Sequence, residues 1–422
     1  MSAKVSGVKG MNDLLPPESA AWQFLERTAR ELAARYGYQE VRTPVLEDTA
    51  LFVRSVGETT DIVGKEMYTF EDKAGRSLSL RPEGTAPSAR AYIEHAIGNR
   101  EPVTKWFYMG PMFRYERMKT GRYRQFHQLG LEAYGAAEPA VDVEAMELVV
   151  RLLAALGLSD VTLHVNSLGD DACRPRYQAE LVSYLTAQRE ALCADCQLRL
   201  ERNPLRVLDC KNPGCQEIAR AAPEILGFLC ADCESHFSEV RRKLDLLGIR
   251  YQVDPRIMRG LDYYTRTTFE FIASDPSLGT ASTVGGGGRY DKLVKQLGGA
   301  DTPAVGLALG LERLVLLLAS RGVDHGEGLE LFVATAEPVA NDPAFTLVSR
   351  LRQEGLRVDF DPRAGSLKSQ LKRADKSGAR FALVLGSAEL ESGKASLKPL
   401  RGGEPVPVSL DAIAATVRAS PT

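Results

Sequence analysis

The chain has 422 residues, of which 53 are basic and 55 acidic, and its formal charge at neutral pH is -2. This balance excludes binding through an overall positive field, so any contact with nucleic acid must come from local basic patches. The N-terminus has no continuous apolar segment, and the chain contains no run of about 18 apolar residues. We therefore expect a soluble, cytoplasmic protein with two or three domains and no membrane span.

Residues 20–48 predict an amphipathic helix followed by a strand. The apolar residues recur at helical spacing as far as Gly37, and the strand that follows meets Pro44. Because any helix-strand unit gives this pattern, it indicates no function by itself.

Residues 77–97 predict a short strand that stops at Arg81-Pro82 and a helix that begins near Ala86. The turn between the two elements contains Glu83 and Thr85. A carboxylate and a hydroxyl at such a turn either cap the helix or contact a ligand, and both interpretations are open.

Residues 107–132 predict two strands joined by a basic loop. The loop contains one acidic residue, Glu116, and five cations, namely Arg114, Arg117, Lys119, Arg122 and Arg124. Charged turns are often only solvated, but a cluster of guanidinium groups is also what binds phosphate groups.

The strand after this loop has two different faces. Period-2 alternation places His127, Leu129 and Leu131 on an apolar face. The opposite face carries Arg124, Phe126, Gln128, Gly130 and Glu132. An aromatic ring, an amide and a carboxylate in a row, with space left by Gly130, suit a ligand that lies across the sheet.

The middle of the chain predicts a helical insertion within a sheet. Residues 142–158 form an apolar-periodic helix closed by Gly157, and residues 161–169 form a strand. From Asp170 to Ile249 the chain consists of charged helical segments with spaced leucines, interrupted by prolines. This change of character indicates an insertion between two parts of one sheet.

Six of the seven cysteines of the chain lie close together in the predicted insertion, between Cys193 and Cys233. They are spaced as Cys193-x2-Cys196, Cys210-x4-Cys215 and Cys230-x2-Cys233. Two C-x2-C pairs in an intracellular chain are typical of a zinc site, which needs four ligands. The sequence leaves open which four bind, and the alternative is a set of reduced, buried thiols. Any zinc here would be structural.

Residues 256–273 alternate and are rich in aromatic side chains, so they predict a strand pair or one long strand with a turn at Gly260. This segment contains Arg259 and Tyr263-Tyr264. The next segment, residues 282–294, contains four successive glycines followed by Arg289 and Tyr290. The glycines either permit close approach of the backbone to a ligand or form a flexible hairpin. The chain contains no P-loop motif.

Residues 304–318 predict a buried strand that becomes a helix near Gly310, with Arg313 in the first helical turn. A cation at a helix N-terminus opposes the helix dipole. An anionic ligand at this position would reverse that penalty.

The last 94 residues, from Leu329 to Thr422, predict a small α/β domain after a short polar linker. Strands at 331–335, 356–360 and 380–386 alternate with helices at 343–355 and 366–378, which indicates a mainly parallel or mixed sheet. The second helix and its flank carry five cations, Lys368, Lys372, Arg373, Lys376 and Arg380. Such a face is either solvated or bound to RNA.

Several of these segments, in this order, resemble the motifs of class II aminoacyl-tRNA synthetases. Residues 20–48, 107–132 and 304–318 are similar to motifs 1, 2 and 3. The runs GRYRQFHQLGLE, RGLDYY and GGGGRYD resemble the versions found in histidyl-tRNA synthetases. The resemblance implies an α+β fold. Its catalytic domain would contain an antiparallel sheet flanked by helices and interrupted by a helical insertion, and an α/β anticodon-binding domain would follow at the C-terminal end.

The resemblance also implies domain bounds and an assembly. The catalytic domain would comprise residues 1–169 and 251–320, with the insertion at 170–250. A linker at 321–328 would lead to the anticodon-binding domain at 329–422. Because motif 1 forms the dimer interface in this family, the chain is expected to be a homodimer.

The implied activity is ATP-dependent ligation of L-histidine to histidine tRNA through a histidyl-adenylate, with ATP bound as its Mg²⁺ complex. Fixed cations would stabilise the charge that develops at the α-phosphorus. The resemblance assigns Arg114 and Arg259 to catalysis at the α-phosphate, Arg313 to the outer phosphates and Phe126 to the adenine. It assigns Glu83, Thr85 and Gln128 to the amino acid backbone, and Glu132, Tyr263, Tyr264 and Tyr290 to the imidazole pocket.

Two other identities are less compatible with the sequence. A regulatory paralogue of ATP phosphoribosyltransferase shares the catalytic fold, but the 94-residue C-terminal domain and the complete run from Arg259 to Tyr264 oppose it. A synthetase for another amino acid is opposed by both histidine-specific signatures. The loop departs from the family at Met118-Lys119, where a Pro-Gln pair is frequent, so its reading of the tRNA acceptor end is open.

Overall fold

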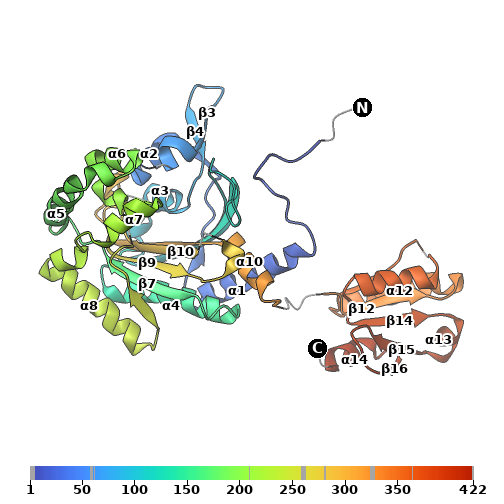
Figure 1. Ribbon diagram of the computed structural model, residues 1–422. Coiled ribbons are helices and arrows are strands. Elements are labelled where there is room, and N and C mark those ends of the chain that lie inside the picture. Colours follow the sequence, from blue (N-terminus) through green and yellow to red (C-terminus); the bar gives the residue numbers. More distant parts are fainter. Residues whose placement is uncertain are drawn as a thin grey trace. The chain divides into compact units, whose positions relative to one another are not determined.

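The computed structural model describes residues 5–57, 60, 62–208, 210–257, 263–279, 282–323, 328–363 and 365–420. It divides the chain into two compact units, Met1–Val323 and Asp324–Thr422 (Figure 1). Within the described ranges, no helix combines the length and apolar composition needed to cross a bilayer.

The first unit is organised around an eight-stranded sheet (Figure 1). Its strands follow the order β1 (Gln39–Glu40), β5 (Thr104–Phe113), β6 (Gln125–Tyr134), β11 (Ala304–Gly310), β10 (Thr283–Arg289), β9 (Thr265–Ile272), β7 (Thr162–Ser167) and β8 (Tyr251–Val253). Only the two outermost pairs, β1 with β5 and β7 with β8, are parallel. The expected antiparallel catalytic sheet is therefore confirmed, and it resumes after the insertion at β8, earlier than the aromatic segment suggested.

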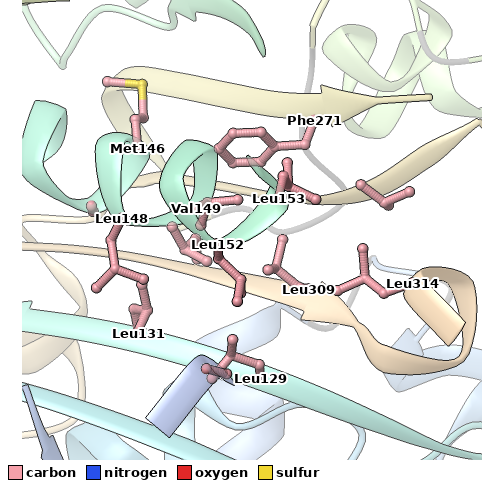
Figure 2. Close-up of a cluster of buried hydrophobic side chains, with 14 of the residues drawn as sticks. Leu129, Leu131, Met146, Leu148, Val149, Leu152, Leu153, Phe271, Leu309 and Leu314 are labelled. Atoms are coloured by element: carbon pink, nitrogen blue, oxygen red, sulfur yellow. The ribbon is translucent and has the colours of Figure 1, made fainter. Parts of the chain in front are cut away.

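Helices α1 (Glu18–Arg35), α4 (Pro139–Ala155), α8 (Ala231–Leu246) and α10 (Leu311–Ser320) share one apolar core with one face of this sheet. Their apolar residues recur at helical spacing, so each helix buries one stripe. Figure 2 shows side chains of α4 facing Leu129 and Leu131 of β6 and Leu309 of β11. The apolar face predicted for β6 is thus the core face. Gly157, at φ 74°, closes α4 as expected.

The predicted strand and helix around Glu83 are both present. The strand is β4 (Ser77–Leu80), the middle strand of a small sheet with β2 (Leu46–Asp48) and β3 (Tyr68–Glu71). The helix is α3 (Thr85–Glu94), which begins one residue earlier than predicted. Helix α2 (Thr49–Val56) packs against α3.

The predicted helical insertion contains α5 (Arg174–Ala187), α6 (Ala194–Arg202) and α7 (Pro213–Arg220). Their buried side chains form a second core, which also includes Tyr134, Tyr263, Tyr264 and Tyr290. The last helix of this segment, α8, packs against α4 and belongs to the main core instead.

The second unit has a mixed sheet with the order β13 (Val358–Phe360), β12 (Leu331–Thr335), β14 (Phe381–Leu385), β15 (Lys394–Pro399) and β16 (Val406–Ser409). The first three strands are parallel, and they confirm the βαβαβ pattern together with α11 (Asn341–Gln353) and α12 (Leu367–Lys376). Helix α11 and α14 (Ile413–Ala419) cover one face, and α12 covers the other. The sequence reading did not include β15, β16 or α14.

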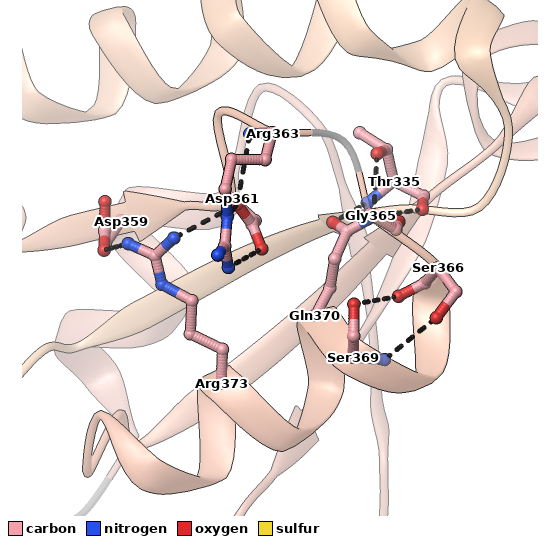
Figure 3. Close-up of polar contacts among 9 residues, drawn as sticks. All are labelled: Thr335, Asp359, Asp361, Arg363, Gly365, Ser366, Ser369, Gln370 and Arg373. Carbon is pink, nitrogen blue, oxygen red and sulfur yellow. Dashed lines mark hydrogen bonds and ion pairs between the residues drawn. The ribbon is translucent and has the colours of Figure 1, made fainter.

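Helix α12 is attached to its sheet by polar contacts (Figure 3). The buried side chain of Gln370 accepts from Thr335 N at 2.9 Å and donates to Thr335 O and Gly365 O. Arg373 lies within 3.1 Å of Asp361 and 3.2 Å of Asp359, and Arg380 donates to Ser420 O. Two of the five predicted cations therefore serve the fold, whereas the other three are exposed, namely Lys368, Lys372 and Lys376.

Candidate active site

A cavity of about 190 Å³ lies on the sheet face opposite the main core. Eight of the site residues predicted from the sequence line it, from five separate segments of the chain. They are Glu83, Thr85, Arg114, Phe126, Gln128, Tyr263, Tyr264 and Arg313. Glu132 and Tyr290 are buried next to Thr85, whereas Arg259 lies outside the described residues.

Glu83 combines the two roles that the sequence left open. Its carboxylate accepts hydrogen bonds from Thr85 N at 2.6 Å and Ala86 N at 3.0 Å, which caps α3. The same side chain lines the cavity and is buried, and burial raises the pKa of its carboxyl group. The cap fixes the direction in which this carboxyl group can meet a cationic ligand.

Arg114 is held rigidly at the start of the basic loop. Its Nε donates to Pro82 O at 2.9 Å, and its guanidinium lies 5.2 Å from the centre of the Phe126 ring. Burial lowers the pKa of Arg114, although a guanidinium stays protonated in proteins. A half-buried cation in contact with an aromatic ring matches a ligand that carries both a phosphate and a planar base.

Arg313 reaches the same cavity from the first turn of α10. It donates to Gly121 O at 3.4 Å and to Thr283 O. Burial lowers its pKa first, and the positive charges of Arg122 and Arg114 lower it further. The repulsion among these cations would be relieved by a polyanion, which makes the cavity suitable for several phosphate groups. Arg122, which also lines the cavity, was predicted only as one of the five loop cations and was given no role of its own.

Glu132 is the centre of a buried hydroxyl cluster. Its Oε1 accepts from Thr85 Oγ1 at 2.7 Å and from Tyr108 OH at 3.1 Å, and its Oε2 accepts from Tyr290 OH. The side chain is fully buried, and burial is the main cause that raises its pKa to about 8. A carboxyl group in this environment can hold or release a proton at neutral pH.

Tyr108 fills the space that Gly130 was expected to leave for a ligand. The two residues lie directly opposite each other in β5 and β6, and a Cβ atom on Gly130 would lie 2.0 Å from Cζ of Tyr108. The prediction that Gly130 leaves space for a ligand is therefore wrong, because Tyr108 occupies this space. Alternation along β5 could have identified Tyr108, since it lies on the same face as Gly110 and Met112.

The glycine run in β10 serves two purposes. Gly285 and Gly286 line the cavity, as expected for close approach to a ligand. Further along, a Cβ atom on Gly287 would lie 2.0 Å from Gly306 O of the neighbouring strand. A Cβ atom on Gly306 would in turn lie 1.8 Å from Oε2 of Glu132. These glycines let β11 pass close to the buried carboxyl group.

Gln128 provides a polar atom that faces the cavity. Its Oε1 is buried and has no hydrogen-bond partner among the described residues. A buried acceptor without a partner costs free energy unless a donor reaches it. An ammonium group is one donor that would satisfy it.

The pKa of Glu132 leads to a prediction for stability. The pKa of Glu132 is about 8 in the folded protein, whereas its ordinary value is 4.5. Between pH 4.5 and pH 8, Glu132 is therefore protonated in the folded protein but ionised in the unfolded chain. Stability should therefore fall as pH rises through this window, by up to about 1.4 kcal/mol per pH unit. Urea unfolding should show the wild-type protein losing stability relative to Glu132→Gln toward pH 8. A difference that stays constant over the window would exclude a protonated Glu132.

Four of the six predicted zinc ligands form one compact group. The Sγ atoms of Cys193, Cys196, Cys210 and Cys215 all lie within 4.8 Å of one another. Cys193 Sγ and Cys210 Sγ are 3.8 Å apart, and Cys193 N donates to Cys215 Sγ. Cys230 and Cys233 are not part of this group.

Two family models match this chain. The model of histidyl-tRNA synthetase matches residues 10–314, and the model of an anticodon-binding domain matches residues 330–420. The first match includes both the cavity and the insertion, and the second lies within the second unit.

Individual proteins with related sequences or structures give the same result. A histidine–tRNA ligase from Anaeromyxobacter sp. (strain K) is 52% identical over 98% of this chain and 99% of its own length. The crystal structure of apo histidyl-tRNA synthetase from S. aureus superposes with a TM-score of 0.80 at 39% identity, covering 98% of this chain and all of that one. An ATP phosphoribosyltransferase regulatory subunit/histidyl-tRNA synthetase from Bacillus halodurans C shares the fold at 21% identity and a TM-score of 0.67, covering 92% of this chain and 100% of that one.

Proposed function

The chain belongs to the histidyl-tRNA synthetase family, and we propose that the cavity beside Arg114 is where histidine reacts with ATP. The reaction of this family is ATP-dependent ligation of L-histidine to its tRNA through a histidyl-adenylate. Relatives of about half identity over nearly the full length assign this activity to the chain. The main support for this location is that one cavity is lined by arginine cations, by an aromatic ring and by polar groups that can bind an amino acid.

The first chemical step needs fixed positive charge. A carboxylate oxygen of histidine attacks the α-phosphorus of ATP in line, the bond to the bridging oxygen breaks, and pyrophosphate leaves. Negative charge grows on the non-bridging oxygens. We assign Arg114 and Arg259 to these oxygens, and Arg313 to the outer phosphates of ATP, which is taken up as its Mg²⁺ complex. Phe126 would stack on the adenine, because Arg114 already lies over its ring.

The amino acid would lie between the capped turn and the hydroxyl cluster. Glu83 and Gln128 offer a carboxylate and an unpartnered oxygen to the ammonium group, and Thr85 links Glu83 to Glu132. Glu132 and Tyr290 would meet the imidazole ring together with Tyr263 and Tyr264. In the second step, a hydroxyl of the terminal adenosine of the tRNA attacks the carbonyl carbon, and AMP leaves.

ATP-pyrophosphate exchange with each of the twenty amino acids tests this function directly. Histidine alone should support exchange. A protein that binds histidine without exchange would instead support the regulatory paralogue, which the match of the second unit to an anticodon-binding domain opposes.

The second unit is assigned to tRNA recognition. Its exposed lysines on α12, Lys368, Lys372 and Lys376, offer charge to a phosphate backbone. We predict that removal of residues 329–422 spares most of the histidine-dependent exchange, because the predicted histidine and ATP ligands all precede this segment. Charging of tRNA should fall strongly. If a folded truncated protein loses both activities equally, the second unit belongs to the catalytic machinery.

We propose that the chain acts in the cytoplasm as a homodimer. Val45 and Leu46, which lie within the segment similar to motif 1, are exposed apolar residues a few positions after the edge strand β1. Such residues favour burial against a second copy. Sedimentation at several protein concentrations measures the assembly.

We also propose one structural zinc ion on Cys193, Cys196, Cys210 and Cys215. The group offers four thiols, the number that a closed tetrahedral site needs. The ligands come from α6, from α7 and from the segment between them, so an ion at this position would fix α6 relative to α7.

A further inference from the structure

The sequence LCADC occurs twice in the insertion, at residues 192–196 and 229–233. Both copies have the same local structure: Cys193 and Cys230 are extended residues immediately before α6 and α8, and the second cysteine lies in the first helical turn. Each copy therefore presents two thiols from one helix start. The first copy belongs to the four-thiol group, but the second copy lies at a different place.

The second copy meets Asp170 and Cys173, two residues that the zinc prediction did not include. One oxygen or sulfur atom from each of Asp170, Cys173, Cys230 and Cys233 lies within 4.8 Å of the other three. Cys173 Sγ is 3.5 Å and Cys230 Sγ 3.9 Å from Asp170 Oδ1. Zinc-sulfur bonds of about 2.3 Å at tetrahedral angles place ligand atoms about 3.8 Å apart, so the four atoms are already close to the required spacing.

We propose that Asp170, Cys173, Cys230 and Cys233 bind a second zinc ion, which joins the two ends of the insertion to the catalytic sheet. Three thiolates and one carboxylate are a ligand set that suits zinc. The group is too compact for an iron-sulfur cluster, whose thiolates lie on the corners of a larger core. The backbone N–H of Cys230 donates to Cys173 Sγ at 3.0 Å, and Ala172 N donates to Asp170 Oδ1 at 3.0 Å. Such bonds orient ligands around a metal.

The location of this group gives the ion a mechanical role. Asp170 follows β7 after Leu168 and Gly169, and Cys230 immediately precedes α8, which packs on the main core. The ion would therefore tie the chain where it leaves the sheet to the chain where it returns. The four-thiol group cannot do this, because its ligands all come from within the insertion.

The same group is connected to the histidine pocket. Leu168 and Gly169 exchange backbone hydrogen bonds with Arg266, which adopts a positive φ of 50°. Arg174, one residue after Cys173, donates to Leu168 O and to Tyr264 O. Tyr264 lines the cavity. An ion that orders the loop from Asp170 to Arg174 would therefore hold the backbone behind this tyrosine.

Metal analysis of the full-length protein, purified without chelators, tests the proposal. We expect two zinc ions per chain, one for each group of ligands. Cys173→Ala and Cys196→Ser should each lower the content to one, and the double variant to none. A zinc content that Cys173→Ala leaves unchanged would overturn the second site. A single ion that Cys196→Ser removes completely would support the first site and exclude the second. Iron in place of zinc would overturn the assigned metal.

Asp170 could bind zinc or only form an ion pair with Arg266, whose guanidinium lies 3.5 Å away. Substitutions of Asp170 distinguish these two roles. Asp170→Ala should lose the second ion, whereas Asp170→Cys, which cannot pair with Arg266, should retain it. Asp171→Ala is the matched control, because this exposed neighbour pairs only with Lys292 among the described residues. Loss of zinc in both Asp170 variants, with retention in Asp171→Ala, would show that Asp170 is not a ligand.

A functional measurement completes the test and depends on the proposed function. In the variants that lose the second ion, the KM for histidine should rise more than the KM for ATP. Asp171→Ala, which should keep both ions, should change neither. If exchange is absent in the wild-type protein, the proposed function fails, but the metal content still decides whether the site exists.

Discussion

Arg114→Ala should lower the rate constant of histidyl-adenylate formation by about 10²- to 10³-fold. The reason is that we propose Arg114 as a cation at the position where charge grows in the transition state, and Pro82 O and the ring of Phe126 hold it there. Histidine binding should change little, because none of the proposed ligands of the amino acid contacts its guanidinium. Rapid-quench measurement of adenylate formation with saturating histidine and ATP gives the rate constant.

Two further variants make this result specific. Arg114→Lys should recover little of the activity, because a point charge cannot replace a planar group that stacks on Phe126. Arg117→Ala is the matched control, since this exposed arginine belongs to the same loop but does not line the cavity. Adenylation at the wild-type rate in Arg114→Ala, or an equal loss in Arg117→Ala, would remove Arg114 from the mechanism.

Phenylalanine should support pyrophosphate exchange about 10⁴- to 10⁵-fold less efficiently than histidine, in terms of kcat/KM. Glu132 is fully buried, and its Oε2 accepts only one hydrogen bond from the described residues, that of Tyr290. An imidazole N–H of histidine can donate a second hydrogen bond to Oε2 of Glu132. A phenyl ring cannot donate this bond, and it would also keep water away from the oxygen. Phenylalanine should therefore be rejected because its ring leaves the carboxyl group of Glu132 without a hydrogen-bond donor.

Glu132→Gln tests the origin of this discrimination. The KM for histidine should rise about 10- to 100-fold, the effect of losing a hydrogen bond to a charged or buried partner, while the KM for ATP stays nearly constant. Glu147→Gln is a suitable control, because Glu147 lies on the surface of α4 in a pair with Arg151. An equal rise of both KM values would show that Glu132 lies outside the histidine pocket.

The sequence predicted the elements of the site well because its signals are local. Alternation in residues 125–134 correctly separated the core face of β6 from the face with Phe126 and Gln128. The strand-turn-helix around Glu83 and the strand-helix junction before Arg313 were also identified from short patterns. Each of these features depends on residues that are neighbours along the chain.

The features that the sequence did not predict depend on register and on contacts between distant segments. Tyr108 became part of the site only because β5 pairs it with Gly130. The fold divides the six cysteines of the predicted zinc pattern between two groups, and Asp170 and Cys173, which were outside that pattern, join one of them. Arg373 was predicted as part of a cationic surface, but it pairs with Asp359 of β13 and with Asp361 just after that strand.

The shared core of the insertion limits how this protein can be rebuilt. The insertion leaves and re-enters the sheet at two neighbouring strands, β7 and β8, so a short turn would appear sufficient to replace it. Its apolar side chains, however, pack in one cluster with Tyr263, Tyr264 and Tyr290. Excision would expose these tyrosines, which we propose form one wall of the histidine pocket, to water. The segment is thus a separate insertion by its position in the chain, but its core is shared with the catalytic domain. We therefore expect that homologous insertions can be exchanged only together with the tyrosines that they cover.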